Sequence, residues 1–518
     1  MAEHDAVVVG SGVNGLACAA LLAKAGWDVC VLERNDWFGG CIRTTELTER
    51  GFLHDVFSAW HPLWVGGAAH AQLADDLARH GLEYVNTELP TATAFPDGES
   101  AFLLRNAEGN VQELGPEWRA VLDSFFPNAD LAFGVLGTEL WSRHGAALGL
   151  KALRRLGRDG VRAFSGGLLV SARDWLEATF VSERARGVLA PWVLHTGLGP
   201  DAATSGYMAQ VIAVAVQEGG MPIPVGGGAK LADALVSFIR EQGGTCETSA
   251  HVDRVFDGGV RVAGGETIAA RRAVVCNVTP TQLYGDLLGG TPPPFRYGRS
   301  EMQIHFALSE PPRWEGDARL ARTAIVHLTA GLDGVSRAVN EADRGLLPAE
   351  ATVVVGQPLT IDPSRAPTGR GILWIQLQEL PWHVRGDAAG HVDVGDGTWT
   401  ETLRERYADR IQARLQRHIP NLDSAILARV ALSPADLQRA NVNLVHGDPY
   451  GGSLALDQSF LWRSPHRTGV RNVWHVGAST HPGPGLGGAS GALVAQQLLE
   501  PPLPRRLAAR ARSLLAGS

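Results

Sequence analysis

The sequence predicts a mixed α/β fold in which one domain is assembled from separated stretches of the chain. At the N-terminus, the β-branched run Asp5–Val9 leads through a glycine-rich loop into an alanine- and leucine-rich helix, and a second apolar run follows at Asp28–Leu32. Such a β-α-β unit is typical of a parallel sheet. Short strand patterns return at 245–277, and a final strand at 473–476 leads through another glycine-rich loop into a helix at 489–499.

Between these stretches the patterns indicate helices first and a mixture of helices and strands later. We expect the region from about 70 to 220 to be largely helical. Further on, Gln303–Leu308 and Ile372–Gln378 read as strands, and Trp399–Arg417 reads as an amphipathic helix. With 518 residues the chain is too long for one ordinary domain.

The N-terminal loop has the spacing G-x-G-x-x-G, at Gly10, Gly12 and Gly15, with Asn14 inside it. In this Rossmann pattern the first glycine makes the turn, the second lets the backbone approach a pyrophosphate, and the third lets the helix pack on the sheet. The helix N-terminus offers free N–H groups to the phosphates. Glu33 ends the second strand, where a ribose hydroxyl needs an acceptor. We therefore expect all five residues in a dinucleotide site.

The segment after Glu33 indicates which dinucleotide the site binds. Arg34 follows, then the pair Gly39-Gly40, and then Arg43. This arrangement resembles the extended motif of FAD enzymes in the flavin amine oxidase and phytoene desaturase superfamily. The resemblance implies that Gly39 and Gly40 let the backbone run against FAD and that Arg43 contacts the pyrophosphate. Cys41 is interpreted as a small buried residue rather than a covalent flavin link.

The C-terminal loop carries a second signature. Its expected cofactor contacts are Gly477, Gly485, Leu486 and Gly487. The segment resembles the C-terminal flavin motif of the phytoene desaturase (carotenoid desaturase) family, with Pro484 in place of a glycine. The pyridine nucleotide-disulfide oxidoreductase domain-containing protein 2 group is a similar branch, although the five cysteines here include no C-x-x-C pair. By the same resemblance, the Val252 backbone contacts the adenine.

The resemblance implies a Rossmann-like FAD-binding domain, discontinuous in sequence, with a mixed substrate-binding domain inserted in it. We expect the FAD-binding domain to comprise residues 1–90, 220–290 and 441–518. The substrate-binding domain is then formed by residues 91–219 and 291–440.

The family implies a flavoprotein oxidoreductase. We expect it to oxidise, or desaturate, a C–C bond of an apolar or partly apolar small molecule by hydride transfer to FAD. Flavin amine oxidases place a lysine near the flavin from later in the chain, and here no lysine follows Lys230. Oxidation of a C–N bond is therefore the alternative, beside a redox-neutral isomerase and a non-catalytic binding protein of the same fold. Oxygen, a quinone or another diffusible acceptor is expected to reoxidise FAD.

Catalytic candidates lie just after the FAD motif, where relatives run toward the isoalloxazine ring. Trp60 and His61 are expected on the substrate side, and a hydrogen-bonded structural histidine is the equal alternative for His61. Gln303 and His305 share one face of a strand, which a solvated sheet face explains better than a pocket. His481, inside the C-terminal motif, is expected to be structural or near the flavin.

Charge and hydropathy restrict the partners. The net charge of -8 disfavours nucleic-acid binding, and no His/Cys cluster has the spacing of a metal site. The odd number and scattered spacing of the five cysteines predict a reduced, cytoplasmic protein without a disulfide framework. We find no signal-peptide pattern and no apolar run of membrane-spanning length. The basic, helix-like stretch Leu150–Phe164 and the stretch Arg505–Leu515 leave peripheral membrane contact open beside a solvated face or a frayed tail. The sequence leaves the oligomeric state open.

Overall fold

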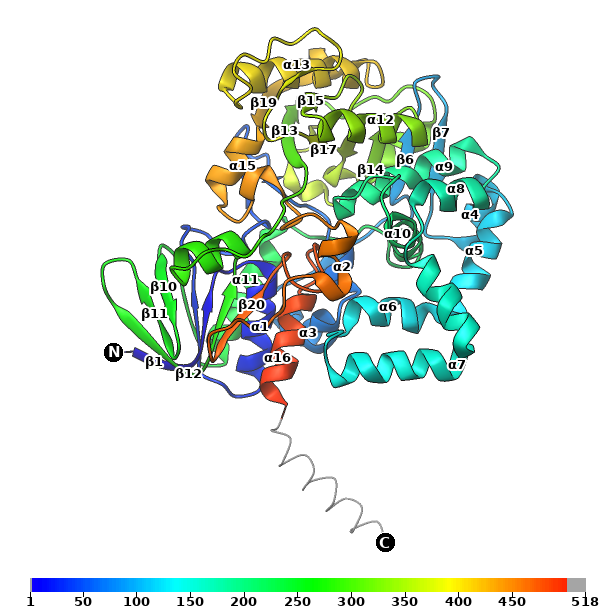
Figure 1. Ribbon diagram of the computed structural model, residues 1–518. Coiled ribbons are helices and arrows are strands. Elements are labelled where there is room, and N and C mark those ends of the chain that lie inside the picture. Colours follow the sequence, from blue (N-terminus) through cyan, green and yellow to red (C-terminus); the bar gives the residue numbers. More distant parts are fainter. Residues whose placement is uncertain (1, 501–518) are drawn as a thin grey trace.

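The computed structural model describes residues 2–500 and contains two large β-sheets with helices packed on both (Figure 1). The first sheet has the strand order β10-β11-β12-β1-β2-β9, and β20 also pairs with β12. Its strands are β1 (Ala2–Val9), β2 (Val29–Leu32), β9 (Thr245–Glu247), β10 (Val252–Phe256), β11 (Gly259–Val262), β12 (Thr267–Asn277) and β20 (Val473–Val476).

The middle of the first sheet is parallel and joins distant parts of the chain. Val8 of β1 pairs with Val275 of β12, and Val275 pairs in turn with Trp474 of β20. The β10–β11 hairpin closes through an Asp257-Gly258 turn, where Gly258 has a φ of 84°. A positive φ favours glycine, so the turn is encoded locally.

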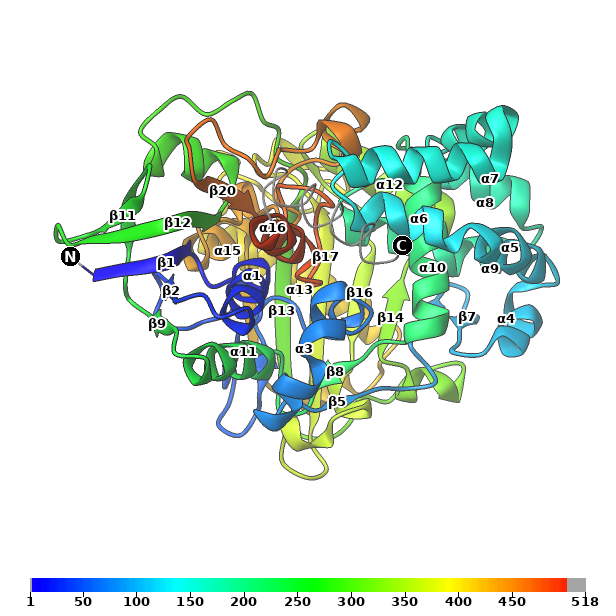
Figure 2. The same cartoon turned by 90° about the horizontal axis from the view of Figure 1, so that it is seen from below.

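Four helices pack on one face of this sheet: α1 (Val13–Lys24), α3 (Ala68–Arg79), α11 (Ala229–Glu241) and α16 (Ala489–Leu499). Alanine-rich α1 is buried along nearly its whole length. A Cβ on Gly491 of α16 would lie 1.9 Å from the Asn14 carbonyl oxygen of α1, so only glycine allows this close crossing. The two ends of the described chain therefore form one layer (Figures 1 and 2).

The second sheet has the order β19-β13-β17-β16-β14-β6-β7. Its strands are β6 (Thr91–Ala94), β7 (Ser100–Leu103), β13 (Ser300–Leu308), β14 (Ile325–Leu328), β16 (Val353–Gly356), β17 (Gly371–Leu380) and β19 (Ile426–Leu432). One face buries Met302, Ile304 and Phe306 against helix α13 (Glu401–Gln416). The opposite face of β13 carries Gln303 and His305, both buried, so the expectation of a solvated sheet face is wrong.

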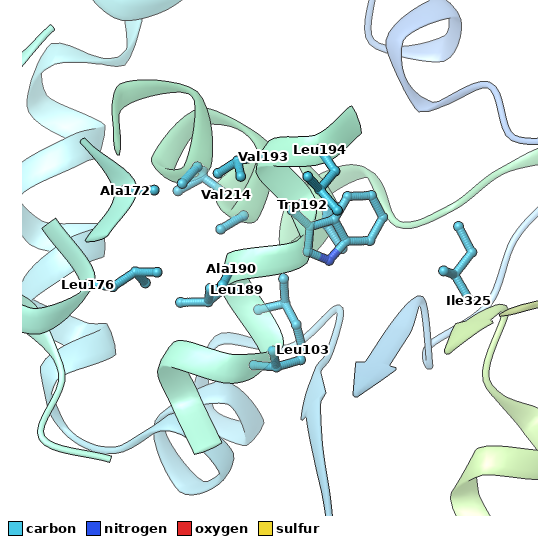
Figure 3. Close-up of a cluster of buried hydrophobic side chains, with 14 of the residues drawn as sticks. Leu103, Ala172, Leu176, Leu189, Ala190, Trp192, Val193, Leu194, Val214 and Ile325 are labelled. Atoms are coloured by element: carbon cyan, nitrogen blue, oxygen red, sulfur yellow. The ribbon is translucent and has the colours of Figure 1, made fainter. Parts of the chain in front are cut away.

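A helical region packs on the far end of the second sheet. Its helices are α4 (Ala107–Leu114), α5 (Glu117–Phe125), α6 (Ala129–Gly137), α7 (Arg143–Gly167), α8 (Ala172–Thr179), α9 (Glu183–Leu189), the 3₁₀ helix η2 (Ala190–Thr196), α10 (Ser205–Gly219) and α12 (Leu332–Asp343). Leu176, Trp192 and Val214 join strand residues Leu103 and Ile325 in one apolar cluster (Figure 3). Figure 2 shows α5, α7 and α8 at the end opposite β11.

The remaining elements are short. They are the strands β3 (Thr44–Thr45), β4 (His54–Asp55), β5 (Tyr84–Val85), β8 (Ile223–Pro224), β15 (Leu346–Leu347) and β18 (Gly386–Asp387), and the helices α2 (Pro62–Val65), α14 (Leu422–Ala425), α15 (Pro434–Ala440) and the π-helix η3 (Thr281–Leu287). The described residues also contain seven further 3₁₀ turns, at 126–128, 318–322, 358–360, 363–365, 445–447, 456–458 and 460–462. The expectation that 70–220 is largely helical is wrong at 84–103, because β5, β6 and β7 occupy it.

The predicted mixed α/β fold with a Rossmann-like domain is confirmed by the two sheets and their helices. The domain boundaries stay a prediction, and the part of the last segment at 501–518, including Arg505–Leu515, lies outside the described residues. Within residues 2–500, no helix combines the length and the apolar character needed to cross a membrane.

Candidate active site

One large cavity lies where the two sheets approach each other. Its volume is 1440 Å³, and its wall includes the N-terminal glycine loop, the C-terminal glycine loop and the β13–β17 part of the second sheet. Cavities for a single drug-sized ligand usually hold about 300–1,000 Å³. This cavity therefore has room for a dinucleotide and a second molecule.

The glycine loop has the predicted geometry. Gly10 has a φ of 89°, and Gly10, Gly12 and Asn14 line the cavity. A Cβ on Gly15 would lie 2.5 Å from the Gly10 carbonyl oxygen, so Gly15 packs beneath the loop instead of lining the cavity. Gly12, the N-cap of α1, has no side chain to accept a hydrogen bond from the first turn of the helix, which leaves N–H groups of that turn for a ligand.

Asn277, at the end of β12, supports the loop and was not singled out from the sequence. A Cβ on Gly12 would lie 2.5 Å from the Asn277 Nδ2, and one on Gly477 would lie 3.0 Å from its Oδ1. Asn277 thus fills the space between the two glycine loops. Asn277 stands at the carboxyl end of a parallel strand, where nucleotide sites form, and this position could have identified it from the sequence.

Glu33 is buried at one end of the cavity and is held by three donors. The Ser11 N–H and hydroxyl donate to its Oε2 at 2.9 and 2.7 Å, and the Asn35 N–H donates to its Oε1 at 2.8 Å. Carboxylate oxygens have further lone pairs, so Glu33 can still accept hydrogen bonds from ribose hydroxyls. Val252 lines the same end of the cavity, as the adenine contact requires.

The segment after Glu33 only partly follows the predicted arrangement. Arg34, Gly39 and Gly40 line the cavity. Arg43 lies outside the cavity wall, and its guanidinium carbon is 3.9 Å from the centre of the Trp37 ring. Its pyrophosphate contact stays a prediction, and the structure gives the side chain an aromatic partner instead.

Cys41 also lines the cavity, and burial raises the pKa of its thiol to about 12. The side chain is therefore a neutral thiol at physiological pH, and it is half-buried, whereas the other four cysteines are buried. All five cysteines are free.

The C-terminal loop borders the cavity beside α1. Gly477, Gly485, Leu486 and Gly487 all line it. Gly485 has a φ of 133°, and α16 begins after Gly488 with no side-chain cap from the described residues. The loop thus presents backbone groups and a helix N-terminus to the cavity. These features fit FAD: two uncapped helix N-termini for its anionic parts, and an acceptor at Glu33 for its ribose.

His481 does not line the cavity. It is buried, and burial lowers the pKa of its imidazole to about 4. The structural alternative for this histidine therefore agrees with its position.

Trp60 and His61, the predicted catalytic candidates, point in different directions. Trp60 lines the cavity and packs edge to face on Trp374, with 5.3 Å between ring centroids. His61 is fully buried outside the cavity wall, with its Nδ1 3.1 Å from the Tyr84 hydroxyl. Burial lowers the pKa of His61 to about 4, so it is neutral at physiological pH. The structure brings only Trp60 to the cavity; the catalytic roles of both residues stay predictions.

Glu301 is a cavity-lining carboxyl that sequence reasoning missed. It is 4% exposed, and burial raises its pKa to about 8. The Gln376 Nε2 donates to its Oε2 at 2.8 Å, and Gln303 donates to its Oε1. The sequence could have identified Glu301, because it continues the alternation of Gln303 and His305 along the strand and so lies on the same face. His305 itself packs on His54, with 5.3 Å between the ring centroids.

Tyr450 is a second missed residue of the cavity wall. Its hydroxyl accepts a hydrogen bond from the Gln378 Nε2 at 2.7 Å. The Asp448 carboxylate accepts the Tyr450 N–H at 2.7 Å, and the buried Arg463 donates to the carbonyl oxygens of Tyr450, Gly451 and Ala478, among others. These buried charges fix the loop that carries Tyr450 against the C-terminal glycine loop.

Around these polar groups the wall is largely apolar. It includes Trp60, Trp192, Met208, Ile212 and Trp374. No lysine lines the cavity within the part of the chain that the structure describes. Within residues 2–500, no group of three or more His, Cys, Asp or Glu side chains is arranged to hold a metal ion.

Comparisons with known proteins agree with this site. The NAD(P)-binding Rossmann-like domain family matches residues 8–77. Over 95% of this chain and 96% of the relative, the sequence is 27% identical to a lycopene-forming phytoene desaturase of Paracoccus sp.. It is 25% identical to the pyridine nucleotide-disulfide oxidoreductase domain-containing protein 2 of Rattus norvegicus, over 94% of this chain and 92% of the relative.

Solved structures show the same fold. A putrescine oxidase variant superposes with a TM-score of 0.61 at 16% identity, over 96% of this chain and 99% of that chain. Cyclohexylamine oxidase from Brevibacterium oxydans superposes with a TM-score of 0.57 at 16% identity, over 96% of this chain and all (100%) of that chain. The predicted resemblance is thus confirmed, and the chain is an FAD-dependent oxidoreductase related to the phytoene desaturases and to pyridine nucleotide-disulfide oxidoreductase domain-containing protein 2.

Proposed function

We propose that the protein desaturates a C–C bond of an apolar or partly apolar small molecule by hydride transfer to FAD. The observation that supports this proposal is one large cavity, which is lined both by the two glycine loops and by apolar side chains. When bound, FAD supplies the two-electron acceptor for the hydride. The chain binds the cofactor through α1, Glu33 and the C-terminal loop, and it holds the substrate against Trp60 and Trp374.

Glu301 is the proposed proton acceptor. Desaturation removes a hydride from one carbon and a proton from its neighbour, and the electron pair left behind forms the double bond. The ionised form of Glu301, a minority at neutral pH because burial raises the pKa of this cavity-wall carboxyl to about 8, takes that proton. Such a pKa suits general acid–base catalysis near neutral pH.

Oxidation of a C–N bond is the second candidate, because putrescine oxidase and cyclohexylamine oxidase share the fold. The described cavity wall contains no lysine, which favours the desaturase over the amine oxidase arrangement. Two further alternatives are an isomerase that needs reduced flavin and a non-catalytic binding protein. In the desaturase proposal, oxygen, a quinone or another diffusible acceptor reoxidises FAD.

The test is anaerobic. The purified protein should show oxidised flavin absorption that bleaches on photoreduction and returns with an acceptor. Mixed in the dark with candidate substrates, the flavin should bleach with a saturated apolar molecule, and the product should be two mass units lighter. Bleaching by amines alone would support C–N oxidation instead, and no bleaching by any substrate after successful photoreduction would favour the isomerase or binding protein.

The cofactor contact at Glu33 has its own test. Glu33→Gln should weaken FAD retention, because the neutral amide is a poorer acceptor for ribose hydroxyls and loses the charge-assisted bonds with Ser11. Glu247→Gln, on the exposed end of neighbouring β9, is the matched control. Equal FAD dissociation constants for the two variants would contradict the ribose contact.

Peripheral membrane contact is the remaining part of the proposal. Trp141 and Trp462 are 76% and 59% exposed, and the Trp141 indole N–H donates to the Leu461 carbonyl oxygen at 2.7 Å. Phe133, also 44% exposed, reaches the cavity wall, so this apolar surface adjoins the cavity. Within α7, Lys151 pairs with Asp130, which reduces the basic character of the helix.

A vesicle assay tests this surface. The protein should co-sediment with anionic phospholipid vesicles, and the double variant Trp141→Ser, Trp462→Ser should remain in the supernatant. Unchanged sedimentation of the double variant would refute the assignment.

A further inference from the structure

The cavity has one polar side in an otherwise apolar wall. We call it the polar wall: Glu301 of β13, Gln376 and Gln378 of β17, and Tyr450 of the loop that Asp448 holds. Gln376 and Gln378 share one face of β17 because side chains alternate along a strand. The charge of Glu301 raises the pKa of Tyr450 further, after the larger effect of burial, which reflects how near the two groups lie.

Only some of the hydrogen-bond donors and acceptors of the polar wall have partners within it. The Gln376 Nε2 donates to Glu301, and the Gln378 Nε2 donates to the Tyr450 hydroxyl. The Gln378 Oε1 has no hydrogen-bond partner among the described residues, although the side chain is only 2% exposed. The Tyr450 hydroxyl accepts one bond, and its own hydrogen has no acceptor among residues 2–500. One acceptor and one donor are therefore left at neighbouring positions.

Buried polar groups without partners are unfavourable, so a ligand that supplies the missing partners binds better than one that does not. A hydroxyl group can accept from Tyr450 and donate to Gln378 at the same time. Turning the Gln378 amide by 180° exchanges its donor and acceptor, and a hydroxyl complements that arrangement as well. A carbonyl can only accept, and a carboxylate would add a negative charge beside Glu301.

Tyr450 is also fixed before any ligand arrives. Its N–H is held by Asp448, its carbonyl oxygen is held by Arg463, and Gly197 packs on its ring. A donor that is already in position loses little conformational freedom on binding, which increases its effect on affinity.

We propose that Tyr450 and Gln378 bind a hydroxyl group of the substrate, so that the substrate is an alcohol with an apolar body rather than a bare hydrocarbon. This inference rests on the proposed function, because it assigns the substrate side of the same cavity. The apolar body lies against the tryptophans of the cavity wall, of which Trp374 stands next to Gln376 on the same face of β17, and the hydroxyl fixes its position along the cavity.

The test compares ligands of equal length on the FAD-loaded protein: 1-decanol, 2-decanone, decanoate and decane. Binding is followed by quenching of tryptophan fluorescence, since Trp60, Trp192 and Trp374 line the cavity. Decanol should bind about tenfold more tightly than decane, which corresponds to about 1.4 kcal/mol. The ketone should fall between the two, and decanoate should bind no better than decane at pH 9, where Glu301 is charged.

Tyr450→Phe and Gln378→Leu should each reduce the decanol preference while leaving the affinity for decane nearly unchanged. Tyr284→Phe, at a half-buried tyrosine outside the cavity wall, is the matched control and should keep the full preference. Retained flavin absorption checks that each variant is folded.

Equal affinities for decanol and decane in the natural protein would overturn the inference, and so would a preference that survives in Tyr450→Phe and Gln378→Leu. Neither result touches the proposed function, which is judged separately by photoreduction and product mass. A protein that binds decanol selectively but never reduces its flavin with any substrate would support the hydroxyl site and refute the desaturase activity.

Discussion

Replacing Glu301 with glutamine tests the protonation of the cavity directly. Burial raises the pKa of the carboxyl to about 8 from its ordinary value of 4.5. At pH 7 a group with that pKa is protonated in about nine molecules of ten. The holoprotein should therefore show an infrared C=O stretch from a protonated carboxylic acid that titrates with a midpoint near pH 8 and is absent in Glu301→Gln.

The raised pKa of Glu301 also predicts how the free energy of unfolding changes with pH, and proton binding determines the direction of that change. The folded state keeps the Glu301 proton up to about pH 8, whereas the unfolded chain loses it near pH 4.5. The stability that this proton contributes is complete below pH 4.5 and is lost as the pH rises through the window from 4.5 to 8. The total is about 5 kcal/mol, at a slope of about 1.4 kcal/mol per pH unit.

The assay is chemical unfolding of the natural protein and Glu301→Gln at a series of pH values, with exposed Glu247→Gln as the control. The difference in unfolding free energy between the natural protein and Glu301→Gln should fall from pH 5 to pH 8 and then become constant. A difference that does not change with pH, together with an infrared band that titrates near 4.5 or is unaffected by the substitution, would refute the reasoning.

Two further predictions concern other parts of the site. Gly15→Ala places a Cβ 2.5 Å from the Gly10 carbonyl oxygen, so it should cost about 1–3 kcal/mol and weaken FAD binding, as measured by thermal unfolding and FAD titration. Gly149→Ala, in open space on α7, should be neutral, and equal effects of the two would contradict this packing argument. Arg365→Met leaves buried Asp55 and Asp362 without their cation and should destabilise the protein by about 3–5 kcal/mol in denaturant unfolding. Exposed Arg337→Met is its control, and a comparable midpoint for both variants would be the contrary result.

The parts of the site that could be predicted from sequence are those whose chemistry is local. Gly10, Gly12 and Glu33 belong to one continuous β-α-β unit, in which spacing alone determines the turn, the close approach and the acceptor. Helix α16 is found at the predicted residues for the same reason. The position of Arg43 could not be predicted in this way. Its guanidinium packs on Trp37 instead of facing the expected pyrophosphate, and a sequence motif does not show which of two partners a side chain contacts.

Features that depend on distant partners could not be predicted in the same way. The strands at 91–94 and 100–103 are short, and β6 is stabilised by pairing with β14, far along the chain. Glu301 of β13 and Tyr450 lie on the same cavity wall because Asp448 and Arg463, which are distant from Glu301 in the sequence, hold the loop that carries Tyr450. The direction of His61 is set by Tyr84, a contact that no local pattern encodes.

The central position of β12 also determines when the protein can become functional during its synthesis. β12 pairs with β1 on one side and with β20 on the other, and α16, which follows β20, packs on α1. A nascent chain emerges from the ribosome N-terminal end first, at about 5–20 residues per second. β1 can therefore pair with β2 early, whereas β12 arrives near mid-chain, and β20 and α16 arrive only after most of the chain has been made. The cofactor-binding cavity, closed by the C-terminal loop, is therefore completed only after residues 477–487 have been synthesised and have left the ribosome. Loading with FAD follows that point, and truncation shortly before β20 removes it altogether.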